Sequence, residues 1–147
     1  MSPGLLAIAF TLDGDIDALR IPPPRPPRVT DRLWQHTCCE IFVAPREASG
    51  YREYNFSPSG EWAAYEFRRY REGGPVSAGT PGIQVRRSAR RLELTAQIAA
   101  SGSRVGASAV IEAADGTLSY WALRHAPGKP DFHHASAFAM ELDEVRH

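Results

Sequence analysis

Three side chains that could bind a metal or exchange a proton lie late in the chain, in the stretch YWALRHAPGKPDFHH at residues 120–134. They are His125, Asp131 and His133. Zinc needs three or four N, S or O ligands, which short-spaced pairs such as His-x-x-x-His usually supply. Here a loop rich in proline and glycine separates the two histidines, so the spacing favours a loop that borders a ligand pocket. A metal centre is the alternative.

A wider set of residues suits the recognition of a polyhydroxylated compound such as a saccharide. A sugar ring has an apolar face that stacks on aromatic rings, and its hydroxyls bind carboxylates, amides and imidazoles. The chain supplies both kinds of group. The predicted ligand-binding residues are Trp34, His36, Glu40, Asn55, Trp62, Trp121, His125, Asp131 and His133. For each tryptophan, packing in the core or at a strand edge is the alternative.

Catalysis is a further possibility for the same residues. His36 and Glu40 share one strand face and Glu53 and Asn55 share another, so adjacent strands could bring a carboxylate and an imidazole together. A buried carboxylate beside a histidine is also typical of a structural ion pair. The chain has no Gly-x-Ser-x-Gly elbow, P-loop or zincin motif. We therefore expect binding rather than turnover. The alternative is an enzyme or metal-dependent activity of His36, Glu40, His125, Asp131 and His133.

Haem and metal ions are alternatives to an expectation of no cofactor. Met140 is the single internal methionine, and it lies beside Phe138 and Leu142 on a face expected to point inward. Methionine in that setting usually fills a core. The chain also lacks a Cys-x-x-Cys-His attachment motif. Haem binding is therefore less favoured than binding of a small organic ligand.

The elements that must position these residues are strands. Apolar residues alternate at period two along most of the chain, and no long window keeps the 3.6-residue stripe of a helix. The turns SPSG at 57–60 and ADG at 114–116 predict hairpins. The expected strands cover residues 6–12, 33–43, 51–57, 61–71, 92–98, 104–113, 117–125 and 137–142. Many short strands at this spacing predict an antiparallel β-sandwich, jelly-roll or immunoglobulin-like, of about eight strands.

Two connecting features follow from the same pattern. Residues 33–43 should form a central strand because both of its faces carry apolar side chains, with Trp34, His36 and Glu40 on one face. The proline-rich segment at 21–28 should be extended and exposed, because prolines cannot donate to a central ladder.

Composition limits the partners. A chain of 147 residues fits a single domain, here residues 1–147, and its 17 basic and 17 acidic residues cancel. No long-range field therefore attracts nucleic acid or a membrane, and the basic stretches at 68–71 and 86–91 are expected to be solvated strand ends. Neighbouring Cys38 and Cys39 should point to opposite faces as reduced thiols. The N-terminal apolar run is too short for a signal peptide, so we expect a cytoplasmic protein.

Three longer stretches share the pattern of a known family: LWQHTCCEIFV at 33–43, YREYNFSPSGEWAAYEF at 51–67 and GTLSYWALRHAPGKPDFHH at 116–134. Together they resemble the bacterial DOMON-like domains, relatives of family-nine carbohydrate-binding modules, over residues 5–142. The resemblance implies an antiparallel β-sandwich whose better-known relatives bind sugars or haem. It also implies that Glu40 and the segment around Asn55 lie on ligand-facing strands.

Two features depart from the family pattern. Cys39 stands where the family usually has phenylalanine, and the strand expected before Leu5 is missing. A missing strand leaves a sheet edge open, and an open edge can pair with another chain. The sequence therefore predicts a homodimer through that edge.

Overall fold

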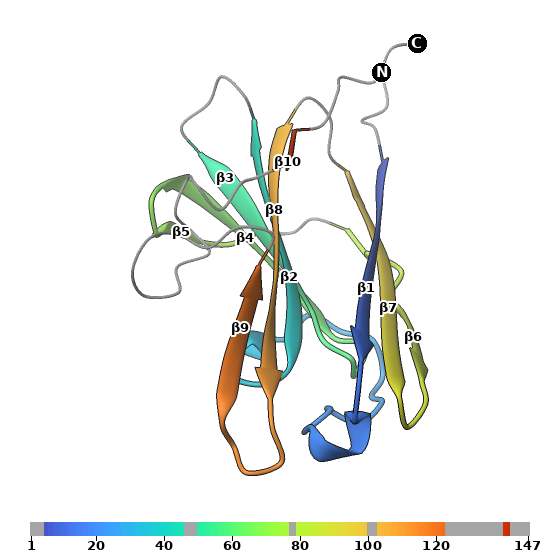
Figure 1. The fold of residues 1–147 in the computed structure, drawn as a ribbon. Helices are drawn as coiled ribbons and strands as arrows, with labels where there is room; N and C mark the ends of the chain where they lie inside the picture. Colours follow the sequence, from blue (N-terminus) through green and yellow to red (C-terminus); the bar gives the residue numbers. More distant parts are fainter. Residues whose placement is uncertain (1–4, 46–49, 77–78, 100–102, 123–139, 142–147) are drawn as a thin grey trace.

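The structure is a computed structural model that describes residues 5–45, 50–76, 79–99, 103–122 and 140–141. Two antiparallel sheets face each other as two layers (Figure 1). The smaller sheet has the order β1-β7-β6, with β1 at Leu5–Asp13, β7 at Arg91–Ala99 and β6 at Gln84–Arg87. This arrangement confirms the all-β sandwich predicted from the alternation.

The larger sheet has the order β10-β8-β2-β3-β4-β5, and β9 also pairs with β8. Its strands are β2 (Cys38–Pro45), β3 (Tyr51–Phe56), β4 (Trp62–Arg69), β5 (Glu72–Pro75), β8 (Ser103–Glu112), β9 (Leu118–Ala122) and β10 (Met140–Glu141). Two short 3₁₀ helices, η1 (Ile16–Ala18) and η2 (Leu33–Gln35), precede β2. Both predicted hairpins are present, β3–β4 around SPSG and β8–β9 around ADG.

The hydrophobic core lies between the two sheets. Alternate residues of each strand point into it, because side chains along a strand alternate between faces. The buried core residues are Cys39, Ile41, Val43, Tyr54, Phe56, Ala64, Leu94, Ala96, Ile98 and Val105. Since the intervening residues of β2 and β3 must face the other way, the large sheet has a second face. We call it the outer face.

The strand predicted at 33–43 is wrong in its first half. Arg32 adopts the left-handed conformation with φ 61°, Leu33–Gln35 forms η2, and β2 begins only at Cys38. The alternation of apolar residues continues through this turn, so the pattern alone could not reveal it. Trp34 and His36 therefore do not extend from β2.

Two short strands, β5 and β6, have no counterpart among the predicted strands. β5 is the sequence EGGP and β6 is fully exposed, so neither shows apolar alternation. Gly73 is required in β5, because a Cβ there would lie 1.9 Å from the carbonyl oxygen of Glu66. In a sequence, a glycine that permits such a close backbone approach looks the same as a turn glycine, so the pattern predicts a turn instead of a strand.

The segment at 21–28 is mostly exposed and has no regular element, as predicted. Beyond it, Val29 forms a parallel bridge with Trp62 at the start of β4. The backbone N–H of Thr30 donates to the carbonyl of Trp62 at 2.8 Å, and the N–H of Trp62 donates to that of Arg28 at 3.1 Å. The segment therefore runs along the β3–β4 hairpin and delivers the chain to η2.

Candidate functional site

Four polar side chains lie together on the outer face of the large sheet. Glu40 of β2 stands opposite Asn55 of β3 on one side and opposite Ser108 of β8 on the other. Glu53 lies two residues before Asn55 on the same strand, and therefore on the same face. All four side chains belong to residues that are at most 5% exposed. We call Glu40, Glu53, Asn55 and Ser108 the polar floor.

The two carboxyl groups of the polar floor resist ionisation. Burial raises the pKa of Glu40, the neighbouring charge of Glu53 raises it further, and the Ser108 hydroxyl, donating to Oε2 at 3.4 Å, lowers it. Burial also raises the pKa of Glu53, and the Asn55 amide and the positive charge of Arg71 partly offset this effect. Because desolvation penalises both charged forms, the pair can hold a proton near neutral pH.

Asn55 is fully buried, yet neither its Oδ1 nor its Nδ2 has a hydrogen-bond partner within 3.5 Å in the part of the chain that the structure describes. The amide lies near enough to Glu53 to lower the pKa of that carboxyl, but not at hydrogen-bonding geometry. A buried amide normally satisfies its donors and its acceptor. Asn55 is therefore a buried amide whose donor and acceptor have no partner among the described residues.

Aromatic side chains flank the polar floor. Tyr65 of β4 stands opposite Glu53, and the ring of Trp34 packs edge-on against Tyr65 with centroids 5.9 Å apart. Trp34 remains 41% exposed, whereas Tyr65 is buried. Beyond Tyr65, the outer face continues with Phe67 and with Tyr51, whose ring stacks on Phe67 at 4.9 Å. An apolar wall with one exposed tryptophan thus lies beside the buried polar groups.

Local contacts hold Trp34 in this position. The Tyr65 hydroxyl donates to the Asp31 carboxylate, which also accepts from the backbone N–H of Arg32 at 2.8 Å. The Tyr65 hydroxyl keeps the pKa of Asp31 below its usual value. These bonds fix the turn at Arg32, and η2 then packs against β2 and β3.

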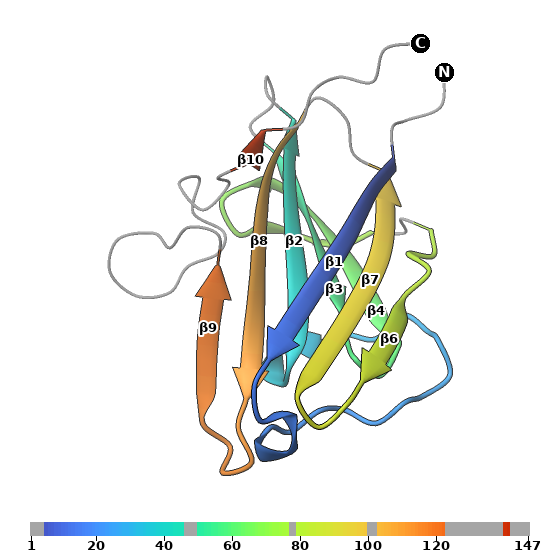
Figure 2. The same ribbon diagram turned by 45° about the vertical axis from the view of Figure 1, so that its right-hand side comes forward.

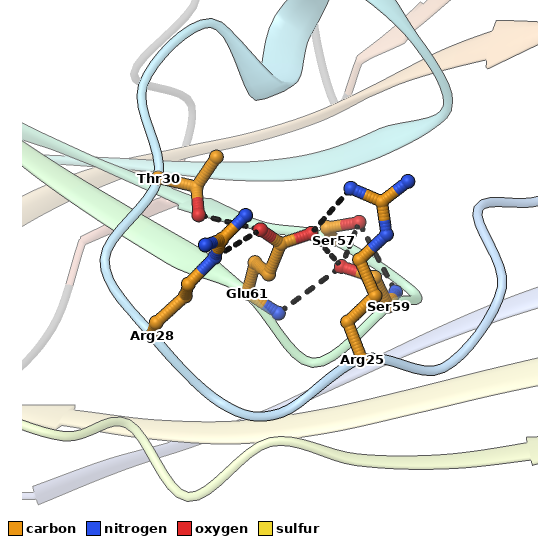
Figure 3. A network of polar contacts seen from close by, with 6 residues as sticks. All are labelled: Arg25, Arg28, Thr30, Ser57, Ser59 and Glu61. Atoms are coloured by element: carbon orange, nitrogen blue, oxygen red, sulfur yellow. Dashed lines mark hydrogen bonds and ion pairs between the residues drawn. The ribbon is translucent and has the colours of Figure 1, made fainter.

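A second polar network anchors the approach to that turn (Figure 3). The buried carboxylate of Glu61 accepts from the Thr30 hydroxyl at 2.6 Å and from Nε of Arg28 at 3.1 Å on one side. On its other side the Ser59 hydroxyl donates at 2.8 Å and Nη1 of Arg25 lies 3.8 Å away. The Thr30 hydroxyl is the main cause that lowers the pKa of Glu61. The network ties the segment at 25–30 to the hairpin turn.

The structure separates the residues predicted to bind a ligand. Trp34, Glu40 and Asn55 share the outer face. Trp62 packs against the core on the inner face, and Trp121 lines a cleft on that inner face. His36 lies apart, with Nδ1 2.9 Å from Glu112 Oε1 at the end of β8. His125, Asp131 and His133 lie outside the described residues, as does the whole loop expected to border the ligand pocket.

Sequence reasoning left Glu53, Tyr65 and Ser108 out of the predicted site. Glu53 could have been included, because it lies two residues from Asn55 on a predicted strand and so shares its face. Tyr65 also had a local signal, because the predicted SPSG hairpin pairs its strand with the strand of Glu53. Ser108 had none, since it reaches the polar floor only through the pairing of β8 with β2.

Within the described residues, no group of three or more His, Cys, Asp and Glu side chains could hold a metal ion. The same residues include no helix long and apolar enough to span a membrane. Both cysteines are buried, and burial is the main cause that raises the pKa of each thiol. Their thiolate forms are therefore disfavoured.

Comparison with known proteins supports the fold. No family model matches the chain, and no curated protein matches its sequence. One solved structure that is similar is the crystal structure of a candidate carbohydrate-binding protein from Bacteroides uniformis ATCC 8492, with a TM-score of 0.54 and 14% sequence identity. The match covers 90% of this chain and 69% of that chain. At this identity the likeness extends to the fold alone.

Proposed function

We propose that this protein binds a saccharide or a similar polyhydroxylated small molecule on the outer face of the large sheet. Trp34 supplies a platform for the apolar face of the ligand, and its 41% exposure leaves part of the ring free to stack. The polar floor supplies the complementary groups. A protonated carboxyl donates a hydrogen bond and an ionised one accepts, so Glu40 and Glu53 can serve both roles toward the hydroxyls of a ligand.

The buried Asn55 amide carries this proposal. An amide offers two donors and an acceptor, and leaving them buried without partners costs about 1–3 kcal/mol of stability. A sugar hydroxyl both donates and accepts, so it can satisfy both ends of such an amide.

Two independent likenesses support the same ligand class. The structural neighbour from Bacteroides uniformis is a candidate carbohydrate-binding protein. The motifs that resemble DOMON-like domains and family-nine carbohydrate-binding modules point to the same chemistry, and the resemblance implies that Glu40 and the segment around Asn55 lie on ligand-facing strands. The relation to those families stays a prediction.

The test is a glycan array followed by titration calorimetry with the best glycan. We expect Trp34→Ala to weaken that glycan about tenfold or more, because it removes the stacking platform. Trp121→Ala is the matched control, since it removes the same side chain from the opposite face and should leave the affinity unchanged. Two results would contradict a ligand site on the outer face. The folded protein would bind no glycan on the array, or the two variants would lose glycan affinity equally.

The paired carboxylates support hydrolysis as a second candidate function. Glycosidases use two carboxyl groups, one of them kept protonated near neutral pH by a raised pKa. Glu40 and Glu53 have that character. Incubating the protein with its best glycan and analysing the mixture by mass spectrometry separates the two functions. Intact glycan after long incubation leaves binding alone.

The free edge of β1 bears on the homodimer predicted from the sequence. β1 pairs with β7 on one side, and no other strand of the described chain pairs with its second edge. Light scattering on the eluting protein measures its mass in solution, and a monomeric mass would contradict the predicted homodimer.

A further inference from the structure

A second candidate site lies on the inner face of the large sheet, where the sandwich is open at one side. β1 is the edge strand of the small sheet, whereas the large sheet continues past β8 to β9 (Figure 2). A cleft of about 620 Å³ lies between β1 and the inner faces of β8 and β9. Its lining is mainly apolar and includes Ile8, Phe10, Leu12, Ile16, Ile111 and Trp121. Volumes of about 300–1,000 Å³ with such a lining are typical of small-molecule sites.

The side chains around this cleft are unusually exposed for core-facing residues. Ile8, Phe10 and Leu12 point inward from β1 but are only half-buried. Trp121 is 64% exposed, and its Nε1 donates to the Ser119 hydroxyl at 3.1 Å, which fixes the ring beside the cleft. An apolar surface of this kind on a single chain commonly marks a binding site.

The end of the cleft near η1 is acidic. Asp13 and Asp15 both line it. Asp13 forms an ion pair with Arg91 at 2.7 Å. No basic side chain in the described part of the chain pairs with Asp15, which is exposed. A ligand with a positive charge at one end would complement this carboxylate.

We propose that the cleft binds a small amphipathic molecule with an apolar body and a cationic head. The body lies against β1, β8 and β9, and the head lies beside Asp15. Of the residues that line the cleft, only Ser108 also belongs to the polar floor. Each of the two proposals can therefore be tested without the other.

A second copy of the chain is the alternative occupant of the cleft. A strand of that copy could pair with the free edge of β1. A strand added to β1 would also cover the cleft, so dimerisation and ligand binding compete. If a second copy occupies the cleft, the protein is a dimer in solution and does not bind the ligand. If a small molecule occupies it, the protein binds the ligand as a monomer.

The test uses the neutral fluorescent probe N-phenyl-1-naphthylamine, displaced by decylammonium, decanol or decanoate below their micellar concentrations. We expect saturable binding of one probe per chain and displacement in the order decylammonium, decanol, decanoate. Trp121→Ala should weaken the probe about tenfold by removing apolar contact. Ala107→Leu should weaken it similarly by filling a position that lines the cleft. Asp15→Asn should remove the preference for decylammonium over decanol while leaving the probe affinity unchanged.

Trp34→Ala is the matched control and should leave probe binding unaltered. Thermal unfolding curves of each variant establish that it is folded. The proposal is overturned if the folded wild-type protein shows no saturable probe binding, or if Trp121→Ala and Ala107→Leu both bind the probe as the wild type does. A stable dimer that excludes the probe would assign the cleft to a strand of a second copy instead.

Discussion

The two faces of the large sheet are built from the same strands, and β3 buries different kinds of residue on each of them. On the inner face β3 presents Tyr54 and Phe56 to the hydrophobic core. On the outer face the same strand presents Glu53 and Asn55, which are equally buried. The inner face therefore gains stability from removing apolar surface from water. The outer face combines a buried apolar cluster of Phe42, Ala44, Tyr51 and Val110 with polar groups whose desolvation costs stability.

This difference is the basis for proposing the outer face as the binding site. A folding core gains nothing from two buried carboxyls with raised pKa values and an amide without a described partner. Groups that cost stability and lie together are typical of binding and catalytic sites. Single substitutions on the two faces can test this division. A substitution on the inner face should mainly lower stability, whereas one in the polar floor should mainly lower ligand affinity.

The largest loss of stability is expected on the inner face. Phe56 is fully buried in the core between the sheets. Phe56→Ala should lower the free energy of unfolding by about 3–5 kcal/mol, since it removes apolar contacts and leaves a cavity. Urea unfolding followed by far-ultraviolet circular dichroism measures this change. A loss below about 1 kcal/mol would mean that the inner face is not the main core.

The next largest effect is expected at the Glu61 network. Glu61→Ala removes a buried carboxylate that accepts from Thr30, Arg28 and Ser59. It should cost about 2 kcal/mol, because hydrogen bonds to a charged group are stronger than neutral ones. Quenching of Trp34 fluorescence should also increase if the segment at 25–30 loosens. A stability loss without any change in quenching would show that the network does not position Trp34.

Much of the fold could be predicted from alternation and turn chemistry. Period-two patterns identified β1, β3, β4, β7 and β8, and the SPSG and ADG turns identified two hairpins. The same alternation placed Glu40 on the face opposite Ile41. These features are local, so neighbouring residues in the sequence are enough to reveal them.

The candidate site could not be predicted from neighbouring residues, because its groups come from segments far apart in the sequence. The alternation runs without interruption from Trp34 into β2, and only the left-handed Arg32 and its bond to Asp31 show that the chain turns first. The meeting of Glu40 with Ser108 requires the register of β2 against β8, two strands far apart in the sequence. The apolar cleft requires knowing that β9 extends past β1. No single stretch of sequence carries these facts.

The polar floor should make stability depend on pH. The folded-state pKa of Glu40 is raised from 4.5 to about 8, so the folded protein binds more protons than the unfolded chain between these values. Its contribution to stability is fully present below pH 4.5 and is lost as the pH rises through about 8. Glu40→Gln should flatten this slope and stabilise the protein at pH 8 by at least about 1 kcal/mol. Chemical unfolding at several pH values measures both effects, and an unchanged slope would contradict a buried, protonated Glu40.

The smallest effect on stability is expected at Asn55, the neighbour of Phe56 on β3. The substitution Asn55→Ala therefore gives the clearest contrast between the two faces. Asn55→Ala removes a buried amide without a described partner, so the relief of its desolvation cost offsets the small cavity that remains. The free energy of unfolding should change by less than about 1 kcal/mol, while glycan affinity falls about tenfold because a donor and an acceptor are lost. Urea unfolding and calorimetry on the same variant give the two numbers. A stability loss above about 2 kcal/mol with unaltered glycan affinity would mean that Asn55 is bonded within the folded chain, and the outer face would then be a polar layer of the core rather than a binding site.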